Sequence, residues 1–391
     1  IENYFNFKIF LHILEVLHKL MWVRGMFPGG QMMQPSVEGA IAALLAVISM
    51  AAATAAPASP PASAPASYEA GRRAFVADMV RKHGFSSEEL AALMADARYQ
   101  QRIVDAMDRP YEGKPWRDYR KIFLTTERIQ GGIAFRREKA ALLERAQAAY
   151  GVPPEIIVAI IGIETNYGRN LGDHRVLDAL STLGFAYPRR ADFFRGELEQ
   201  FLLLSRDERV DARAAKGSYA GAVGKPQFIP SSYRSYAVDF DNDGRRDLWQ
   251  SNADVIGSVG NYLAQHGWRR GEPIAVPAVL RDGRPAGVPI ADKRPAEPHA
   301  RLSRWAAVGV EPAPGRTGRA GDALADSLAA ALIELDGVGP EYWLGFDNFY
   351  AITRSNHSNL YAMAVFQLSL AIAEGLGQQA DAAAGTAGVL R

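Results

Sequence analysis

The chain has no cysteine among its 391 residues. This absence excludes disulfides, thiolate metal sites, a thiol nucleophile and a lipid-modified N-terminal cysteine. Net charge is nearly absent as well, because 44 lysines and arginines stand against 43 aspartates and glutamates and leave a formal charge of +1. Nucleic-acid binders carry a strong cationic field. We therefore expect no nucleic-acid partner.

The N-terminal region lacks an apolar run as long as a membrane span. Residues 1 to 31, which begin with Ile1, are set aside from the fold interpretation. Ala40 to Ala56 is apolar and ends in small residues that suit a signal peptidase, but it falls short of the roughly 20 residues of a span. Arg24 is the only nearby upstream cation. We expect an exported, periplasmic protein, with an uncleaved N-terminal membrane anchor as the alternative.

What the chain does have is helical periodicity followed by a short region rich in β-formers. Apolar residues recur at spacings of three and four before Tyr150, and Ser86 ahead of two glutamates is typical of a helix start. The fold class we predict is mainly α (α+β). The predicted segments are 1–67 leader, signal peptide and Pro/Ala linker; 68–150 N-terminal helical region; 151–270 catalytic core; 271–344 strand-containing insertion; 345–378 C-terminal helix; 379–391 flexible tail.

Strands are predicted within the insertion, where short β-prone pieces alternate with Gly, Pro and Asp. The pieces are PIAVPAVL, GVPIA and RWAAVGV. The last long helix is predicted over NLYAMAVFQLSLAIAEGL, with a fraying Gly/Ala tail after it.

One carboxylate interrupts the apolar run EIIVAIIGIETNYGRNLG. A helix opened by Pro153 and Pro154 would place Glu164 on the same face as the isoleucines. Burial disfavours the charged form of a carboxylate, so its pKa rises and it can hold a proton near neutral pH, as a general acid must. The structural alternative is a helix-end glutamate that turns to solvent or pairs with Arg169 or Arg175. The Asn-Tyr-Gly-Arg that follows offers an amide, an aromatic platform and a flexible backbone, which suit a carbohydrate cleft.

The sequence lacks the motifs that other catalytic chemistries require. There is no H-E-x-x-H for zinc, and the apparent phosphate loop ending at Lys225 has Tyr219 at the first glycine position and Pro226 in place of Ser or Thr. GSYAG fails the G-x-S-x-G pattern. Cleavage of a glycosidic bond by a carboxylic acid is the chemistry that these motif checks leave as the best candidate.

Three ordered motifs resemble the lytic murein transglycosylase B family. They are PPEIIVAIIGIETNYGRNLG with LDALSTLGFAYPRRADFFRGELEQFLLL, then GSYAGAVGKPQFIPSSYRSYAVDFDNDG, then NFYAITRSNHSNLYAMAVFQL. The resemblance implies a lysozyme-like helical core and non-hydrolytic cleavage of the β-1,4 bond between N-acetylmuramic acid and N-acetylglucosamine of peptidoglycan. It also implies that Glu164 acts first as acid and then as base, which gives 1,6-anhydromuramyl products without an organic cofactor. We expect glycan strands as partners, other cell-wall enzymes as further candidates, and a monomer.

The resemblance also assigns substrate-binding roles. They fall on Ser218 and Gln227 near the cleavage point, Tyr119 along the cleft, Asn356 and Tyr361 on the C-terminal side, and Arg189 and Arg190 at a stem-peptide or lactyl carboxylate. Ser355 stands where the family pattern has Tyr, so stacking from that position is lost.

The segment DFDNDGRRDLWQ matches the first half of a calcium-binding, EF-hand-like loop. Its oxygen ligands fall at positions 1, 3 and 5 and Gly244 at position 6. Gln250 replaces the bidentate Glu at position 12, so the closing ligand must come from elsewhere, and the resemblance points to Asp254. The predicted structural calcium ligands are Asp239, Asp241, Asp243, the backbone of Arg245, and Asp254. The alternative is a polar turn that caps a helix.

Two other functions stay open on the sequence. One is a hydrolytic, goose-type lysozyme, in which Asp173 or Asp178 would serve as a second acid with a water molecule. The other is a non-catalytic peptidoglycan-binding scaffold, against which the combination of Glu164, Ser218 and Gln227 argues.

Overall fold

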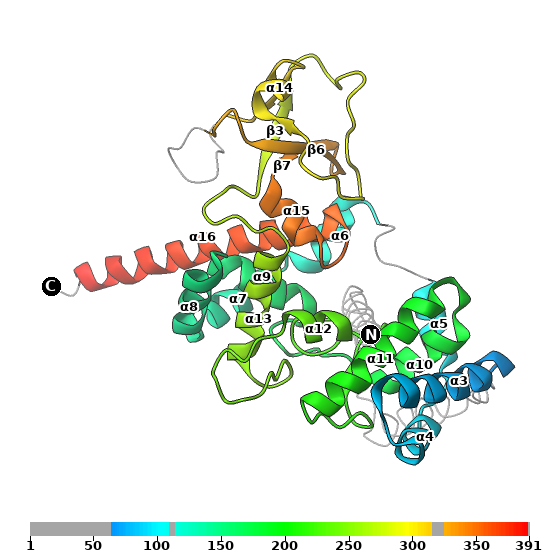
Figure 1. Ribbon diagram of the computed structural model, residues 1–391. Coiled ribbons are helices and arrows are strands. Elements are labelled where there is room, and N and C mark those ends of the chain that lie inside the picture. The colour runs from blue at the N-terminus through cyan, green and yellow to red at the C-terminus, as the bar shows by residue number, and fades with distance from the viewer. Residues whose placement is uncertain (1–63, 109–113, 315–323, 390–391) are drawn as a thin grey trace, which may run out of the picture. The chain divides into compact units, whose positions relative to one another are not determined.

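The computed structural model describes residues 64–108, 114–314 and 324–389. These residues are mainly helical with a smaller antiparallel sheet, which confirms the predicted fold class (Figure 1). The chain divides into a unit Ile1–Pro60 and a unit Pro61–Arg391, and every element below belongs to the second. The predicted signal peptide and most of the predicted linker lie outside the described residues.

The first helices pack against a later helical pair. Their bounds are α3 (Ala66–His83), α4 (Ser87–Ala95) and α5 (Gln101–Met107). The Ser86 side chain accepts a hydrogen bond from the Glu89 backbone N–H at 3.3 Å, so the predicted helix start is confirmed as an N-cap. Helices α3 and α5 contact α10 (Val176–Ala186), which in turn packs along α11 (Ala191–Asp207).

The buried centre is α9 (Pro154–Thr165), which carries Glu164. A helix that is apolar on every side must be covered on every side. Its cover comes from α7 (Thr126–Glu138), α8 (Ala140–Tyr150), α13 (Asn252–Gln265) and α16 (Asn359–Val389). Pro153 serves as N-cap with Pro154 at the first helical position, as predicted.

Short elements connect or flank these helices along the chain. They are α6 (Trp116–Phe123), η2 (Pro188–Arg190), α12 (Pro230–Tyr236), α15 (Asp347–Thr353), and the antiparallel pair β1 (His174–Arg175) and β2 (Lys216–Gly217).

The insertion forms an antiparallel sheet in the order β4-β6-β7-β3-β5. The strands are β3 (Ala275–Leu280), β4 (Ala300–Arg301), β5 (Val310–Pro312), β6 (Ala329–Asp336) and β7 (Pro340–Gly345). Side chains alternate along β6: Ile333 joins the main core, whereas Leu332 packs in a second cluster with Trp305 of α14 (Leu302–Ala306). Strand β6 is therefore buried on both faces.

Two of the three predicted strand segments are corrected. PIAVPAVL contains β3 as predicted. GVPIA forms no strand and contributes only a bridge between Ala291 and Ile333. RWAAVGV divides into the end of α14 and the start of β5, because Trp305 packs as part of a helical turn. Strands β6 and β7 were not predicted: alanine and leucine favour helix locally, and only pairing with distant strands makes AAALIELD extended.

The last helix is longer than predicted. Instead of ending at 378, α16 continues to Val389. Alanine has the highest helix propensity, and extending an existing helix is easier than nucleating one, so the alanine-rich tail stays helical. Within the described residues, Asn359–Gln379 is also long and apolar enough to cross a membrane, but half of the tested window is buried inside the protein. Its packing against α9 and α7 accounts for that composition.

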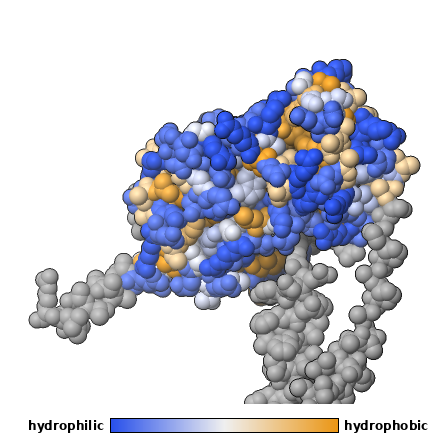
Figure 2. All heavy atoms as spheres, turned by 90° about the horizontal axis from the view of Figure 1, so that it is seen from below, coloured by the Kyte–Doolittle hydropathy of each residue, from blue (hydrophilic) through white to orange (hydrophobic). Residues whose placement is uncertain are grey.

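The face shown in Figure 2 mixes hydrophilic and apolar side chains, with hydrophilic ones prevailing. The large apolar side chains that remain exposed include Ile122, Phe193, Val279, Val308, Val338 and Leu370. Phe193, which is 40% exposed, lines the cavity described next.

Candidate active site

Glu164 lies in the last turn of α9, where the helix reaches a cavity of about 660 Å³. Ile160, one turn earlier, lines the same cavity, while Ile157 and Ile161 are fully buried. The structure therefore confirms the predicted position of Glu164 at the edge of an apolar helix face. Arg169 and Arg175, the alternative partners, pair with Glu127 and with Asp96 and Asp178.

Burial raises the pKa of Glu164 from its ordinary 4.5 to about 7. The Tyr361 hydroxyl donates a hydrogen bond to Glu164 Oε1 at 2.6 Å, which stabilises the carboxylate and opposes part of that rise in pKa. Burial beside Glu164 also raises the pKa of Tyr361 well above its usual value, so the phenol remains a donor. The pair can hold or release one proton near neutral pH.

The turn after Glu164 has an unusual backbone. Asn166 and Tyr167 both have positive φ, at 49° and 62°, a region that side chains other than glycine seldom adopt. Asn166 ends α9, and its N–H returns to the carbonyls of Ile161 and Gly162. Such a conformation persists only when the surrounding structure holds it in place.

Tyr167 provides that hold from inside the protein. Its hydroxyl donates to the Arg128 carbonyl at 2.7 Å. A Cβ added at Gly131, Gly132 or Gly162 would come within 2.8, 2.6 or 2.6 Å of the Tyr167 side chain. The interpretation of this tyrosine as an aromatic platform for sugar is thus wrong: its ring fills a cradle of glycines behind Glu164.

Glu164 is the only carboxylate among the described residues that line the cavity. Asp173 is exposed and does not line it. Asp178 is buried, and its carboxylate accepts hydrogen bonds from the Arg98 backbone and the Gln100 side chain and pairs with Arg175. Neither aspartate is placed to be the second acid that a goose-type lysozyme would need.

Ser218 and Gln227 lie on a loop that lines the cavity. Ser218 Oγ accepts hydrogen bonds from the backbone N–H groups of Ala220 and Ala222 at 3.3 and 3.0 Å, so its own hydrogen is left to donate. Gln227, at a positive φ of 50°, donates its amide to the carbonyls of Leu171 and Gly224. This leaves the Gln227 amide oxygen as the end that can accept from a ligand.

The C-terminal wall of the cavity is the segment between α15 and α16. Asn356 and Tyr361 both line it, together with the small Ser355 that replaces an expected tyrosine. Arg354 and His357 line it as well, and sequence reasoning named neither. Both flank Ser355 and Asn356 in the motif RSNH, and this adjacency was a signal that could have identified them.

Tyr119 does not line the cavity. It is 3% exposed and packs between Trp116 and Phe123, with ring centroids 6.4 and 5.2 Å away. Burial is the main cause of the raised pKa of Tyr361, and the electrostatic effect of the nearby Tyr119 adds to it. The structure therefore buries Tyr119 in the core, where α6 packs against α16, instead of along the cleft.

The two arginines of YPRR have different surroundings, and only the second lines the cavity. Arg189 pairs with Asp108 at 3.2 Å and does not line the cavity. Arg190 lines it, and its guanidinium lies 4.3 Å from the ring centroid of Phe193. Phe193 itself was missed, although two consecutive phenylalanines after YPRR were an available signal.

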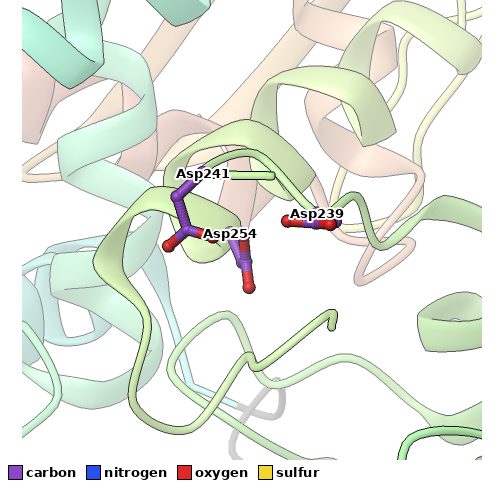
Figure 3. Close-up of side chains that lie close together, drawn as sticks. All are labelled: Asp239, Asp241 and Asp254. Atoms are coloured by element: carbon purple, nitrogen blue, oxygen red, sulfur yellow. The ribbon is translucent and has the colours of Figure 1, made fainter. Parts of the chain in front are cut away.

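A second acidic group forms on the loop before α13. Carboxylate oxygens of Asp239, Asp241 and Asp254 all lie within 4.8 Å of one another, and the three side chains converge in Figure 3. Ligands on opposite sides of a calcium ion at about 2.4 Å are separated by about that distance, so the group fits calcium. Burial and the charges of Asp241 and Asp239 raise the pKa of Asp254. A divalent cation would relieve this repulsion.

The rest of the predicted calcium loop is arranged differently. Asp243 is not a member of the group, and its Oδ1 accepts from the Arg245 backbone N–H at 2.9 Å. Gln250 is exposed, and its backbone carbonyl accepts from Lys225 Nζ. The third carboxylate of the group therefore comes from Asp254, in the first turn of α13, and not from the twelfth residue of the loop.

Comparison with known proteins gives consistent matches. The family model described as the transglycosylase SLT domain matches residues 67–370. The chain is 45% identical over 310 residues to the membrane-bound lytic murein transglycosylase B of Escherichia coli (strain K12), which covers 76% of this chain and 81% of that protein.

Solved structures agree. The soluble lytic transglycosylase SltB1 from Pseudomonas aeruginosa is 47% identical with a TM-score of 0.71, over 80% of this chain and 100% of that one. The Escherichia coli lytic transglycosylase Slt35 in complex with calcium is 45% identical with a TM-score of 0.69, over 78% of this chain and 93% of that one.

Proposed function

Because this chain belongs to the transglycosylase SLT family and is a peptidoglycan-cleaving lytic murein transglycosylase, we propose that Glu164 carries both proton transfers of its reaction. The substrate is the β-1,4 bond between N-acetylmuramic acid and N-acetylglucosamine. Cleavage without water leaves a 1,6-anhydromuramyl end. The observation that supports this role most strongly is that Glu164 is the only carboxylate among the described residues lining the cavity, with its pKa raised to about 7.

In the first step Glu164 is the general acid. Tyr361 donates to Oε1, so the transferable proton belongs on Oε2. Oε2 gives this proton to the glycosidic oxygen as the bond to C1 breaks, and the leaving sugar departs as an alcohol. The hydrogen bond from Tyr361 strengthens as Glu164 becomes anionic, since bonds to charged acceptors are stronger.

In the second step the same carboxylate is the base. It takes the proton from the muramyl 6-hydroxyl as that oxygen attacks C1, which restores the neutral acid. One group suffices because the residue that gave up a proton is ready to accept the next. Retaining glycosidases use a second carboxylate about 5–5.5 Å away, and the sugar's own N-acetyl oxygen takes that part here.

Polar side chains hold the muramyl residue against Glu164. The Ser218 hydroxyl donates to a sugar oxygen, and the Gln227 amide oxygen accepts from the N-acetyl N–H. Asn356 contacts the sugar from the opposite wall. These roles are supported by the backbone hydrogen bonds that already orient Ser218 and Gln227.

Product analysis tests this function. Purified sacculi are digested and the soluble muropeptides are weighed by mass spectrometry. We expect anhydromuramyl ends, one water lighter than reducing ends. Reducing muramyl ends alone would mean that water is the nucleophile and would refute the transglycosylase mechanism, and absence of any product would support the scaffold alternative.

We propose that calcium binds at Asp239, Asp241 and Asp254 as a structural ion, with Asp243 and the Arg245 carbonyl as further ligands. The spacing of the three carboxylates and the repulsion among them support the site, and Slt35 is known in complex with calcium. No organic cofactor is needed for a reaction between a carboxyl group and a sugar.

We also propose that the protein works in the periplasm, where its substrate is found. The apolar segment of residues 40–56 supports export, and the curated relative is membrane-bound. Alkaline-phosphatase fusions after residue 67 would test it: active fusions support export, and inactive ones contradict it.

A further inference from the structure

Two arginines in the cavity form no direct ion pair with the residues that the structure describes. Neither Arg190 nor Arg354 has a carboxylate oxygen within 4.0 Å among the described residues, although both line the cavity with Glu164. Arginines elsewhere are commonly paired, as Arg189 is with Asp108 and Arg281 with Glu311. Among the described residues that line it, the cavity thus carries two arginines without a direct ion pair and one carboxyl group, whose pKa burial raises to about 7.

Arg354 is held in place by a neutral group. Its Nη1 donates to the Tyr350 hydroxyl at 2.9 Å, and its guanidinium lies 5.1 Å from the centroid of the Tyr350 ring. The Tyr350 hydroxyl in turn donates to Glu297 at 3.1 Å. The phenol therefore orients the guanidinium, while its Nε and Nη2 hydrogens have no partner among the described residues.

Among the described residues no carboxylate pairs directly with Arg354, and the Glu297 carboxylate reaches it only through the Tyr350 hydroxyl. Burial raises the pKa of Tyr262, in α13, to about 12 and lowers the pKa of His266 at the end of that helix, while the nearby charge of Arg354 acts to lower both. Burial lowers the pKa of His266, so this histidine is neutral at pH 7. Ser355, next in the chain, is too small to cover the guanidinium.

We infer that Arg354 is a carboxylate receptor that makes this enzyme select glycan strands bearing acidic groups near the cleaved bond. Arg190, the last residue of η2, lines the same cavity and provides the second positive charge. The planar guanidinium fork matches a carboxylate and binds it through paired hydrogen bonds. This inference rests on the proposed function, since it names which part of the peptidoglycan the site recognises.

Peptidoglycan offers that carboxylate from two sources. Stem peptides carry free carboxylates, whereas the lactyl group of N-acetylmuramic acid is amide-linked to the peptide. When an amidase removes the peptide, the lactyl carboxylate becomes free. Chito-oligosaccharides have the same backbone linkage and no carboxylate at all.

Binding to the Glu164→Gln protein separates these cases without turnover. Three ligands of matched length are titrated by calorimetry: peptide-bearing strands, amidase-treated strands and a chito-oligosaccharide. Arg354→Gln is added to the Glu164→Gln background, with Arg354→Lys to restore charge without the fork. Arg281→Gln, which removes a paired arginine on the distant sheet, is the matched control.

We expect Arg354→Gln to weaken binding of at least one acidic ligand about tenfold or more, as for a hydrogen-bonded charge, and to leave chito-oligosaccharide binding unchanged. Arg354→Lys should recover part of the loss, and Arg281→Gln should lose nothing. In the active enzyme, Arg354→Gln should raise KM with little change in kcat, the pattern of lost ground-state binding. The acidic ligand that is weakened identifies the source of the carboxylate.

Two outcomes would overturn the inference. Equal affinities of the Arg354→Gln and parent proteins for all three ligands would show that no carboxylate is received there. An equal loss for all three, including the uncharged one, would show that Arg354 only supports the wall. Because these measurements record binding, they remain informative even if sacculi yield no anhydromuramyl product, which would refute the proposed function separately.

Discussion

Two regions of this molecule use carboxylates in opposite ways. At the end of α9, one glutamate faces a cavity with no other acid among the described residues that line it, and burial is the main cause of its raised pKa. Where the loop before α13 meets the first turn of that helix, carboxylate oxygens of three aspartates lie within 4.8 Å of one another, with Asp241 exposed, Asp239 half-buried and Asp254 buried. A solitary buried carboxylate keeps its proton, whereas a crowded set of carboxylates attracts a cation.

The supports of the two regions differ as well. Glu164 is held by its place in α9 and by the hydrogen bond from Tyr361, and the turn after it is held by Tyr167, which packs against three glycines. The aspartates are fixed by backbone N–H groups, such as those of Phe240 and Asp247, that point at Asp254. Chemistry at the first site should therefore respond to small changes in packing, and the second should respond to ions.

The largest effect is expected from Glu164→Gln. General acid and general base catalysis each contribute about 10²–10⁴-fold, so release of anhydromuropeptides should fall at least 10³-fold. The folded-state pKa of about 7 lies above the unfolded value of about 4.3, so the ionised form destabilises the fold increasingly as pH rises through that window. At pH 8 the variant should therefore melt at the same temperature as the parent or higher.

Glu155→Gln, in the first turn of the same helix and paired with Arg136, is the matched control and should keep its activity. Unchanged cleavage by Glu164→Gln would mean that another residue is the acid.

A smaller effect is expected from Tyr361→Phe. The Tyr361 hydrogen bond lowers the pKa of Glu164, so its loss should raise that pKa. Because the reaction begins with protonated Glu164, activity falls as pH rises through this pKa. The alkaline limb of kcat/KM should thus move to higher pH, while kcat at the optimum drops roughly tenfold, as for one hydrogen bond to a charged group. A limb that moves to lower pH would contradict the assigned hydrogen bond.

Packing behind the acid is tested by Gly132→Ala. The added Cβ would lie 2.6 Å from the Tyr167 hydroxyl and 2.4 Å from Ile372 Cδ1. Overpacking of this kind costs about 1–3 kcal/mol, and a displaced Tyr167 should reduce kcat several-fold with KM nearly unchanged. Gly196→Ala in α11, whose Cβ would meet nothing within 4 Å, should leave activity intact. Equal activities for both variants would show that the packing of Tyr167 against these glycines does not affect catalysis.

The smallest effect on activity is expected at the aspartates. Chelation should lower the melting temperature by several degrees and leave kcat close to that of the untreated enzyme, with calcium restoring the melt. Asp241→Asn, a substitution at an exposed member of the group, should remove most of this response. Identical melts with and without chelator would count against the site.

Local patterns were enough to predict the position of Glu164 at the edge of a buried face but not its hydrogen-bond partner. Apolar spacing placed this glutamate at a buried edge before any contact was known. Its hydrogen bond to Tyr361 spans 197 residues of sequence, and periodicity carries no information about such a pairing. Tyr361 was named through resemblance to a family and not through physics.

The failures have a common physical cause. Tyr167 looked like a cleft residue because it follows the acid, but two positive φ values turn its ring inward. Tyr119 follows helical spacing in α6, and spacing alone does not say which wall that helix faces. Strand β6 reads locally as helix, and pairing with β7 overrides it. Each error concerns contacts between distant segments.

The proposed reaction depends most directly on the protonation of one side chain. We would follow the carboxyl carbon of Glu164 by NMR in selectively ¹³C-labelled protein, with Glu164→Gln used to assign the signal, from pH 4 to pH 9. We predict a titration midpoint near 7. A midpoint in the ordinary range for glutamate, about 4 to 5, would show an ionised carboxylate at working pH and contradict its role as the acid.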